Sequence, residues 1–182
     1  MMDLANASTS LSDLAAAITA LKLPLTFGDP AVAAFDKVKI FDLQDLAVAM
    51  EELFAFSNRI AIIALDGVDH ETEVGGNSLK IKRSLTLTII MADRRYSDRQ
   101  KALTGDATTP GVLLLQKLLV DAVSGKLSAG AVAQPGPGRL VAIEHEKRPN
   151  ETGRIVFAQD FSVSLAWDAV SLARDARIAA AK

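Results

Sequence analysis

The longest regular pattern in this chain is an alternation of apolar and polar residues over residues 79–93. Apolar side chains occupy the odd positions Leu79, Ile81, Leu85, Leu87 and Ile89. Lysine, serine and threonine occupy the even positions from Lys80 to Thr88, which is the period of a strand with one face in a core. Arg83 alone breaks the apolar side. The run exceeds the usual strand length of about 5 to 6 residues, so it predicts one long scaffold strand.

A second strand is predicted immediately upstream. Residues 59–65 are almost continuously apolar and rich in β-branched side chains, a pattern typical of a strand buried on both faces. Asp66-Gly67 predicts a turn that ends this strand. The acidic stretch that follows, up to the break at Gly75-Gly76-Asn77, is expected to be a flexible connection. Residues 59–93 are therefore expected to form a long antiparallel pair.

A second hairpin is predicted near the C-terminus. Residues 139–145 follow a Gly/Pro-rich turn at 134–138 and have strand character. Residues 154–168 form the next strand. Its inward positions are Ile155, Phe157, Phe161, Val163, Leu165 and Trp167, with Gln159 as the only polar residue among them.

Helical spacing of apolar residues predicts three helices. The first covers residues 10–22 and stops before Pro24, because the residue before a proline avoids helical geometry. The second covers 43–55, with Asp42 as its N-cap. The third follows Thr109-Pro110 and runs to Gly125, with Lys117 and Asp121 spaced as an i,i+4 pair. This third helix is apolar around most of its circumference, so it lies deep in the core or faces a neighbouring subunit.

Two further segments carry weaker patterns. Residues 37–41 are a candidate short strand. The Ala-rich tail, residues 169–182, is a candidate helix that becomes ordered on assembly.

The order of elements predicts an α+β fold. A mainly antiparallel sheet of about four to five strands would pack against two to three helices. The chain has 182 residues, no internal repeat and no long linker, so one domain spanning residues 1–182 is expected.

Composition narrows the function classes. The net charge of −2 gives no general case for binding nucleic acid or an anionic membrane. The absence of cysteine excludes disulfides, thiolate metal sites and cysteine nucleophiles, and fits a reducing cytoplasm. No secretory signal is expected, since no basic segment precedes an apolar one at the start, and no apolar run reaches membrane-spanning length.

No residue pattern in the sequence indicates an enzyme. His70 and His145 are the only histidines, and the two glutamates beside His145 would point to the opposite face of a strand. Asp160 and Asp168 lie beside aromatic strand positions and are interpreted as solvated carboxylates. We therefore expect no catalytic residue, no metal ligand and no cofactor.

One local signal is basic. From Lys80 to Lys101 there are seven basic residues against two acidic ones. One hypothesis is a patch that contacts an acidic partner or the backbone of DNA. The other is a set of charges that protects a strand from edge pairing. The candidate subunit or partner interface comprises Lys80, Lys82, Arg83, Arg94, Arg95, Asp98 and Arg99. Asp98 and Arg99 beside Arg94 and Arg95 suit pairing between identical subunits in a ring.

Taken together, these segments resemble a known family. The run L-x-L-x-I-x-M-A-D-R-R, then T-P-G-V-L-L-L-Q-K-L-L-V-D-A-V-S-G-K-L, then R-L-V-A-I-E-H and R-I-V-F-A-Q-D-F-S-V-S-L-A-W resembles the small tail proteins of Mu-like phages and prophages. That family is similar to the tail terminators of long-tailed phages. The resemblance covers roughly residues 55–170. Residues 1–40 and 169–182 lie outside it as possible assembly extensions.

The resemblance implies a structural virion protein. Such proteins form a ring, typically a hexamer, that caps the tail tube, stops its polymerisation and joins the tail to the head-side connector. The implied partners are other copies of the chain, the tube protein, and the sheath and head–tail connector proteins. DNA would be met only in passing through the ring. The implied location is the host cytoplasm during assembly and then the virion.

Two alternatives remain open at this stage. One is a monomeric α+β module that binds a small molecule or peptide between the sheet and the helix at 43–55. The other is an enzyme that uses carboxylates which the sequence does not single out.

Overall fold

The computed structural model describes residues 3–28, 31–42, 51, 53, 58–75, 78–93, 99–126, 131–141, 155–165 and 168–171. Its helices are α1 (Asp3–Ala20), α3 (Arg99–Thr104) and α4 (Gly111–Val123), with a 3-10 turn, η1, at Leu25–Phe27. Its strands are β1 (Lys37–Asp42), β2 (Ile60–Gly75), β3 (Ser78–Ala92), β4 (Gly125–Lys126), β5 (Val132–Val141), β6 (Val156–Ser164) and β7 (Asp168–Ser171).

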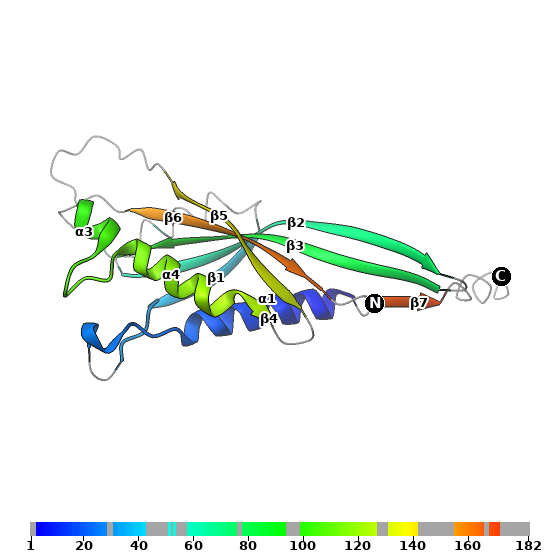
Figure 1. The fold of residues 1–182 in the computed structure, drawn as a ribbon, viewed down its shortest axis with the longest axis horizontal. Coiled ribbons are helices and arrows are strands. Elements are labelled where there is room, and N and C mark those ends of the chain that lie inside the picture. Colours follow the sequence, from blue (N-terminus) through cyan, green and yellow to red (C-terminus); the bar gives the residue numbers. More distant parts are fainter. Residues whose placement is uncertain are drawn as a thin grey trace.

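All the strands belong to one sheet, drawn along the long axis in Figure 1. Their order is β1-β2-β3-β6-β5-β4, and β7 pairs with the outer part of β3. Only β1 and β2 run parallel; the other neighbours are antiparallel. Because β4 and β7 are short, the sheet consists mainly of β1, β2, β3, β5 and β6. The predicted α+β class and mainly antiparallel sheet are confirmed.

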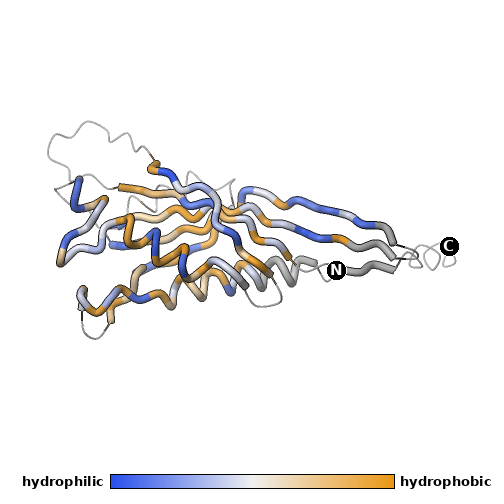
Figure 2. The backbone as a smooth tube through the Cα atoms, in the orientation of Figure 1, coloured by the Kyte–Doolittle hydropathy of each residue, from blue (hydrophilic) through white to orange (hydrophobic). Residues whose placement is uncertain are grey.

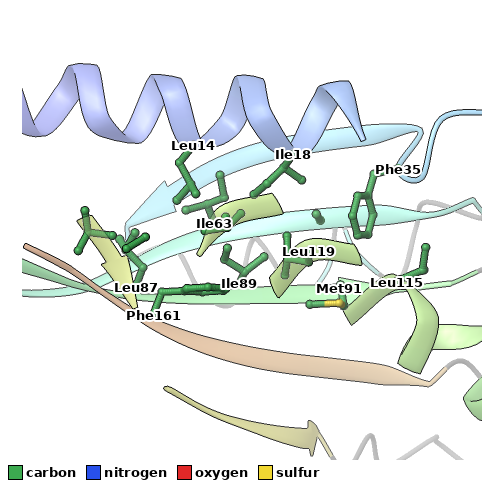
Figure 3. Packing of buried hydrophobic residues seen from close by; sticks show 14 of the residues in the cluster. Leu14, Ile18, Phe35, Ile63, Leu87, Ile89, Met91, Leu115, Leu119 and Phe161 are labelled. Carbon is green, nitrogen blue, oxygen red and sulfur yellow. The ribbon is translucent and has the colours of Figure 1, made fainter. Parts of the chain in front are cut away.

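The main core lies between α1, α4 and one face of the sheet, which we call the helix face. Leu14 and Ile18 from α1 and Leu115 and Leu119 from α4 point toward the strands (Figure 3). The strands contribute Ile63, Leu85, Leu87, Ile89, Met91, Phe157, Phe161 and Val163. The odd residues of β3 therefore face the core as the alternation predicts, but only from Leu85 onward, since Ile81 is just half-buried.

The opposite side of the sheet, which we call the second face, is apolar over only part of its area. A smaller cluster there contains Leu53, Ile60, Ile62, Ile90, Ala92, Val156 and Ala158. Further along, the face becomes polar, where Asp160 accepts hydrogen bonds from Thr88 Oγ1 and Arg139 Nη1. Residues 60–64 are thus buried on both faces, as predicted.

Beyond the body, β2 and β3 continue as a two-stranded projection. Their pairing runs without interruption from Ile60 opposite Ala92 to Gly75 opposite Ser78, with one bulge between Leu65 and Gly67. Figure 1 shows the pair extending far past the helices, with β7 beside its outer part. Hydrophobic residues gather in the body, whereas the projection is mostly hydrophilic (Figure 2). The predicted long antiparallel pair is confirmed.

Two predicted turns are wrong. Asp66-Gly67 does not end a strand, because the chain absorbs Asp66 as a bulge and β2 continues to Gly75. Consequently the acidic stretch predicted as a flexible connection is strand. Residues 134–138 likewise lie inside β5, again with a bulge. Prolines are tolerated there because β5 lies near the sheet edge, where a missing N–H removes no essential ladder bond.

The helix boundaries differ modestly from the predictions. α1 begins at Asp3 rather than at residue 10, and α4 covers Gly111–Val123. The Lys117–Asp121 pair is confirmed, with 2.6 Å between Nζ and Oδ2. The predicted strand at 37–41 is present as β1.

Other predictions meet the structure only in part. Of the helix predicted at 43–55, Glu51 and Leu53 are described and both are helical. The start of the predicted helical tail, through Ser171, is instead the strand β7, and residues 172–182 lie outside the described residues.

Candidate assembly surface

The projection formed by residues 66–75 of β2 and 78–84 of β3, called the arm below, contains the first three residues of the predicted interface. The bulge at Asp66 decides how the arm presents its side chains. Before the bulge, Ala64 lies opposite Thr88; after it, Gly67 lies opposite Thr86 and Val68 opposite Leu85. Because side chains alternate strictly along a strand, the extra residue reverses the phase of everything beyond it. Val68 is thereby placed on the helix face and Asp69 on the second face.

Acidic residues form a row on the second face of the arm. Asp69, Glu71 and Glu73 recur at every second position of β2 and are exposed. Lys82 lies opposite Glu71, and its Nζ is 3.7 Å from Glu71 Oε2. Lys80 lies opposite Glu73 in the register. Since the Glu71 side chain remains 68% exposed, this ion pair leaves the carboxylate accessible to another molecule.

Because of this cross-strand pairing, the basic residues of β3 do not make the arm basic as a whole. In the register, Arg83 lies opposite His70, Lys82 opposite Glu71 and Lys80 opposite Glu73. Together with Asp66 and Asp69, β2 supplies four carboxylates against the three cations of β3. A count along the sequence alone from Lys80 finds a basic segment because it omits the antiparallel partner.

The helix face of the arm has a different character. Val68, His70 and Thr72 lie on it, opposite Leu85, Arg83 and Ile81. Val68 is 44% exposed, one of the few large apolar side chains that the described residues present to solvent. The arm therefore combines a charged face with a partly apolar one.

No described strand covers the outer edge of β2 along the arm. β1 pairs with β2 only from Ile60 to Leu65. Among the described strands, none pairs with β2 from Asp66 to Gly75 except β3 on the inner side. β3 is flanked by β2 on one side and by β6 and β7 on the other. An open strand edge of this length offers backbone N–H and C=O groups to another strand.

The remaining interface residues lie elsewhere. Arg94, Arg95 and Asp98 fall outside the described residues. Arg99 is the first residue of α3, which lies at the opposite end of the molecule from the arm (Figure 1). From Arg83 to the inner end of β3 is already roughly 30 Å at the rise of a strand. Lys80, Lys82 and Arg83 therefore lie apart from Arg99, and the predicted pairing among Arg94, Arg95, Asp98 and Arg99 stays a prediction.

Near Arg99 the chain makes a tightly built turn between α3 and α4. Asp106 accepts hydrogen bonds from Thr108 N at 2.8 Å and Thr108 Oγ1 at 2.9 Å, and its carboxylate is 3.2 Å from Lys101 Nζ. The hydrogen bonds from Thr108, followed by Lys101, hold the pKa of Asp106 well below its usual range. Gly105 adopts a φ of 76° and approaches the backbone of Thr109 and Pro110 closely.

α4 is capped from a distance. Pro110 directly precedes the helix and makes no side-chain capping hydrogen bond. Instead, Asp93 at the end of β3 is 1% exposed and accepts a hydrogen bond from Gly111 N at 3.1 Å. A carboxylate at a helix N-terminus is also favoured by the helix dipole. Asp93 thus ties the inner end of the scaffold strand to α4.

The acidic row was the part of the surface that sequence reasoning missed. A signal existed: residues 68–74 read Val-Asp-His-Glu-Thr-Glu-Val, with a charged residue at every second position. That period is typical of a strand with two unlike faces. The preceding Asp66-Gly67 pair predicted a turn, so the alternation after it was not interpreted as a strand.

The described residues hold no group of three or more His, Asp or Glu side chains that could bind a metal ion. No helix in the part of the chain that the structure describes is long and apolar enough to span a membrane. Comparison with protein-family models and with curated protein sequences finds no match for this chain.

Proposed function

We propose that this protein is a structural component of a phage or prophage tail. In this role it is a tail terminator: copies form a ring, of hexameric type, that caps the tail tube, stops its polymerisation and joins the tail to the head connector. The partners are further copies of the chain, the tube protein, and the sheath and connector proteins.

The arm is the observation that carries the proposal. The arm is narrow: it consists of β2 and β3 with β7 as a short third strand, and so narrow a sheet gains little packing within its own subunit. Its side chains contribute little to the core, since Val68, His70 and Thr72 are all exposed. Such a structure is well suited to reach a neighbouring molecule. Contacts of this kind, between different surfaces of identical subunits, generate rings when the rotation closes.

α4 supplies a second supporting observation. Val112, Leu115, Leu119 and Val123 are buried in the core, as expected. Leu113, on the outer side of this helix, is 41% exposed. Leu113 is the one large apolar side chain of α4 that is exposed, and a subunit contact would cover it.

The proposal is tested by electron microscopy of the purified full-length protein, alone and with tube protein. Rings that cap one end of the tubes and shorten them are the expected result. A strict monomer at high concentration that leaves tube growth unchanged would refute the proposal. It would favour the alternative, a monomeric module that binds a small molecule or peptide.

A further inference from the structure

Two open strand edges of this chain are complementary. The first is the outer edge of the arm, residues 66–75 of β2. The second is the outer edge of β1, which stands at the end of the strand order and has β2 as its only described partner strand. Both edges belong to the same sheet, so each has a helix face and a second face.

On the second face the two edges carry opposite charges. Lys37 lies opposite Ile60 and Lys39 opposite Ile62, and both isoleucines belong to the second-face cluster. Because directly opposed residues share a face, the two lysines lie on the second face of β1. The carboxylates of Asp69, Glu71 and Glu73 occupy the same face of the arm. Lysines and carboxylates thus recur with the same two-residue period on the two edges.

On the helix face the two edges carry exposed apolar side chains. Ile40 lies opposite Ile63, a core residue of the helix face, and is 45% exposed. Val68, on the helix face of the arm, is 44% exposed. If the arm lay beside β1 with the two sheets continuous, Ile40 and Val68 would fall on the same side of the joint. Burial of both would add a hydrophobic contribution to the backbone hydrogen bonds.

The charges also exclude the competing arrangements. Two arms side by side would oppose their carboxylates, and two β1 edges would oppose their lysines. Like charges directly opposite each other destabilise a strand pair. Of these three pairings, the arm of one copy against β1 of another is the one that brings opposite charges together.

We infer that the arm of one copy adds to the sheet of the next at the β1 edge, with Asp69, Glu71 and Glu73 meeting Lys37 and Lys39. Both edges lie on the same side of the sheet, because β1 pairs with the side of β2 that faces away from β3. Joining the edges with their faces aligned turns the second copy by about 180° about the sheet normal, so the arm of each copy lies beside β1 of the other in a two-fold pair. This inference goes beyond the proposed ring, because it names a pairwise contact between copies that does not by itself close a larger ring.

Two charge-reversed variants test the contact. The β1-reversed variant carries Lys37→Glu and Lys39→Glu. The arm-reversed variant carries Asp69→Lys and Glu71→Lys, together with Lys82→Glu, which keeps the cross-strand ion pair with its sign reversed. Each variant alone should self-associate at least tenfold more weakly than the wild type at about 0.15 M salt, because like charges then face each other. An equimolar mixture should recover assembly, since the two different copies again oppose unlike charges.

Cysteine cross-linking gives a second measurement on folded protein. The chain has no cysteine, so Ile40→Cys with Val68→Cys introduces one thiol on each edge. Mild oxidation should produce a covalent dimer, because the two-fold contact brings Ile40 of each copy to Val68 of the other. The matched control joins Val68→Cys to Leu140→Cys, because Leu140 is 53% exposed on β5 instead. The control should give no covalent dimer.

The outcomes separate this inference from the proposed function. If both reversed variants form the wild-type assembly alone, or if their mixture fails to assemble and the Ile40–Val68 pair gives no covalent dimer, the arm–β1 contact is wrong while the ring proposal stands. If the wild type itself stays monomeric at every concentration, the ring proposal is refuted and this contact with it.

Discussion

Asp93 offers a direct test of how the scaffold strand is joined to α4. Its buried carboxylate accepts the hydrogen bond from Gly111 N, 3.1 Å away. Asp93→Ala would remove this acceptor and leave a buried N–H at the helix start without it. Asp93→Asn would keep a carbonyl oxygen of similar position but remove the charge.

The expected magnitude follows from the burial. A hydrogen bond to a charged acceptor contributes about 1.5–3 kcal/mol, and a charge at a partly buried helix N-terminus up to about 2 kcal/mol more. We expect Asp93→Ala to lower the free energy of unfolding by about 2–3 kcal/mol. For a chain of this size that corresponds to a fall in Tm of roughly 4–12 °C. Asp93→Asn should lose about half as much free energy, because one acceptor remains.

Urea denaturation followed by circular dichroism measures these differences. Asp121→Ala is the matched control, because that aspartate pairs with Lys117 on the exposed side of the same helix, with side chains 69% and 59% exposed. Exposed i,i+4 pairs contribute about 0.3–0.5 kcal/mol. If Asp93→Ala cost no more than Asp121→Ala, remote capping of α4 would be refuted.

Three other substitutions probe the rest of the subunit. Gly105→Ala should lower the free energy of unfolding by about 3 kcal/mol or more in urea denaturation, because a Cβ there would lie 2.4 Å from Pro110 O at a φ of 76°. Gly67→Ala is the control and should lower it far less, since nothing lies within 4 Å of the added Cβ. Equal losses in the two variants would contradict a steric role for Gly105. Gln159→Leu should lower the free energy of unfolding by about 2 kcal/mol, because the buried Gln159 amide donates to Gly136 O at 2.8 Å and accepts from Gln116 Nε2 at 2.8 Å. An unchanged free energy of unfolding would show that the bulge in β5 does not need this amide. Asp106→Asn should flatten the acid side of the curve of unfolding free energy against pH. Because the pKa of Asp106 is lowered in the folded protein, its stabilising contribution is fully present above the unfolded pKa of about 4 and declines as pH falls below it. An unchanged acid side of this curve would contradict a stabilising role for the Asp106 carboxylate.

The sequence predicted the parts of the fold whose side-chain pattern is set by burial. β3 and β6 carry the alternation of a half-buried strand, and Leu87, Ile89 and Phe161 lie in the core as that alternation requires. α4 shows the same agreement, with Leu115 and Leu119 buried. In these segments a local pattern and the tertiary environment point the same way.

The errors arose where local turn chemistry competes with long-range pairing. Asp66-Gly67 has the composition of a turn, yet a strand as long as β3 needs a partner of equal length, and this pairing converts the turn residues into a bulge. Pro135 behaves similarly in β5, where its position at the sheet edge makes the missing donor harmless. Neither outcome can be read from a window of a few residues.

The candidate surface was predicted only in part. Lys80, Lys82 and Arg83 were chosen by local charge, and they do lie on the arm. Their acidic counterparts on β2 were not chosen, because cross-strand neighbours become visible only when the register is known. The lysines of β1 were missed for the same reason, since they gain significance only beside another sheet edge.

The most direct test of the account compares the mass of the wild-type protein in solution with that of an armless variant. In this variant, residues 69–84 are replaced by Asn-Gly, which forms a tight hairpin turn between Val68 and Leu85, an opposed pair in the register. Native mass spectrometry should find one closed multimer for the wild type and a folded monomer for the armless variant. A wild-type monomer at every concentration, or an armless variant that still forms the same multimer, would contradict the claim that the arm joins the copies.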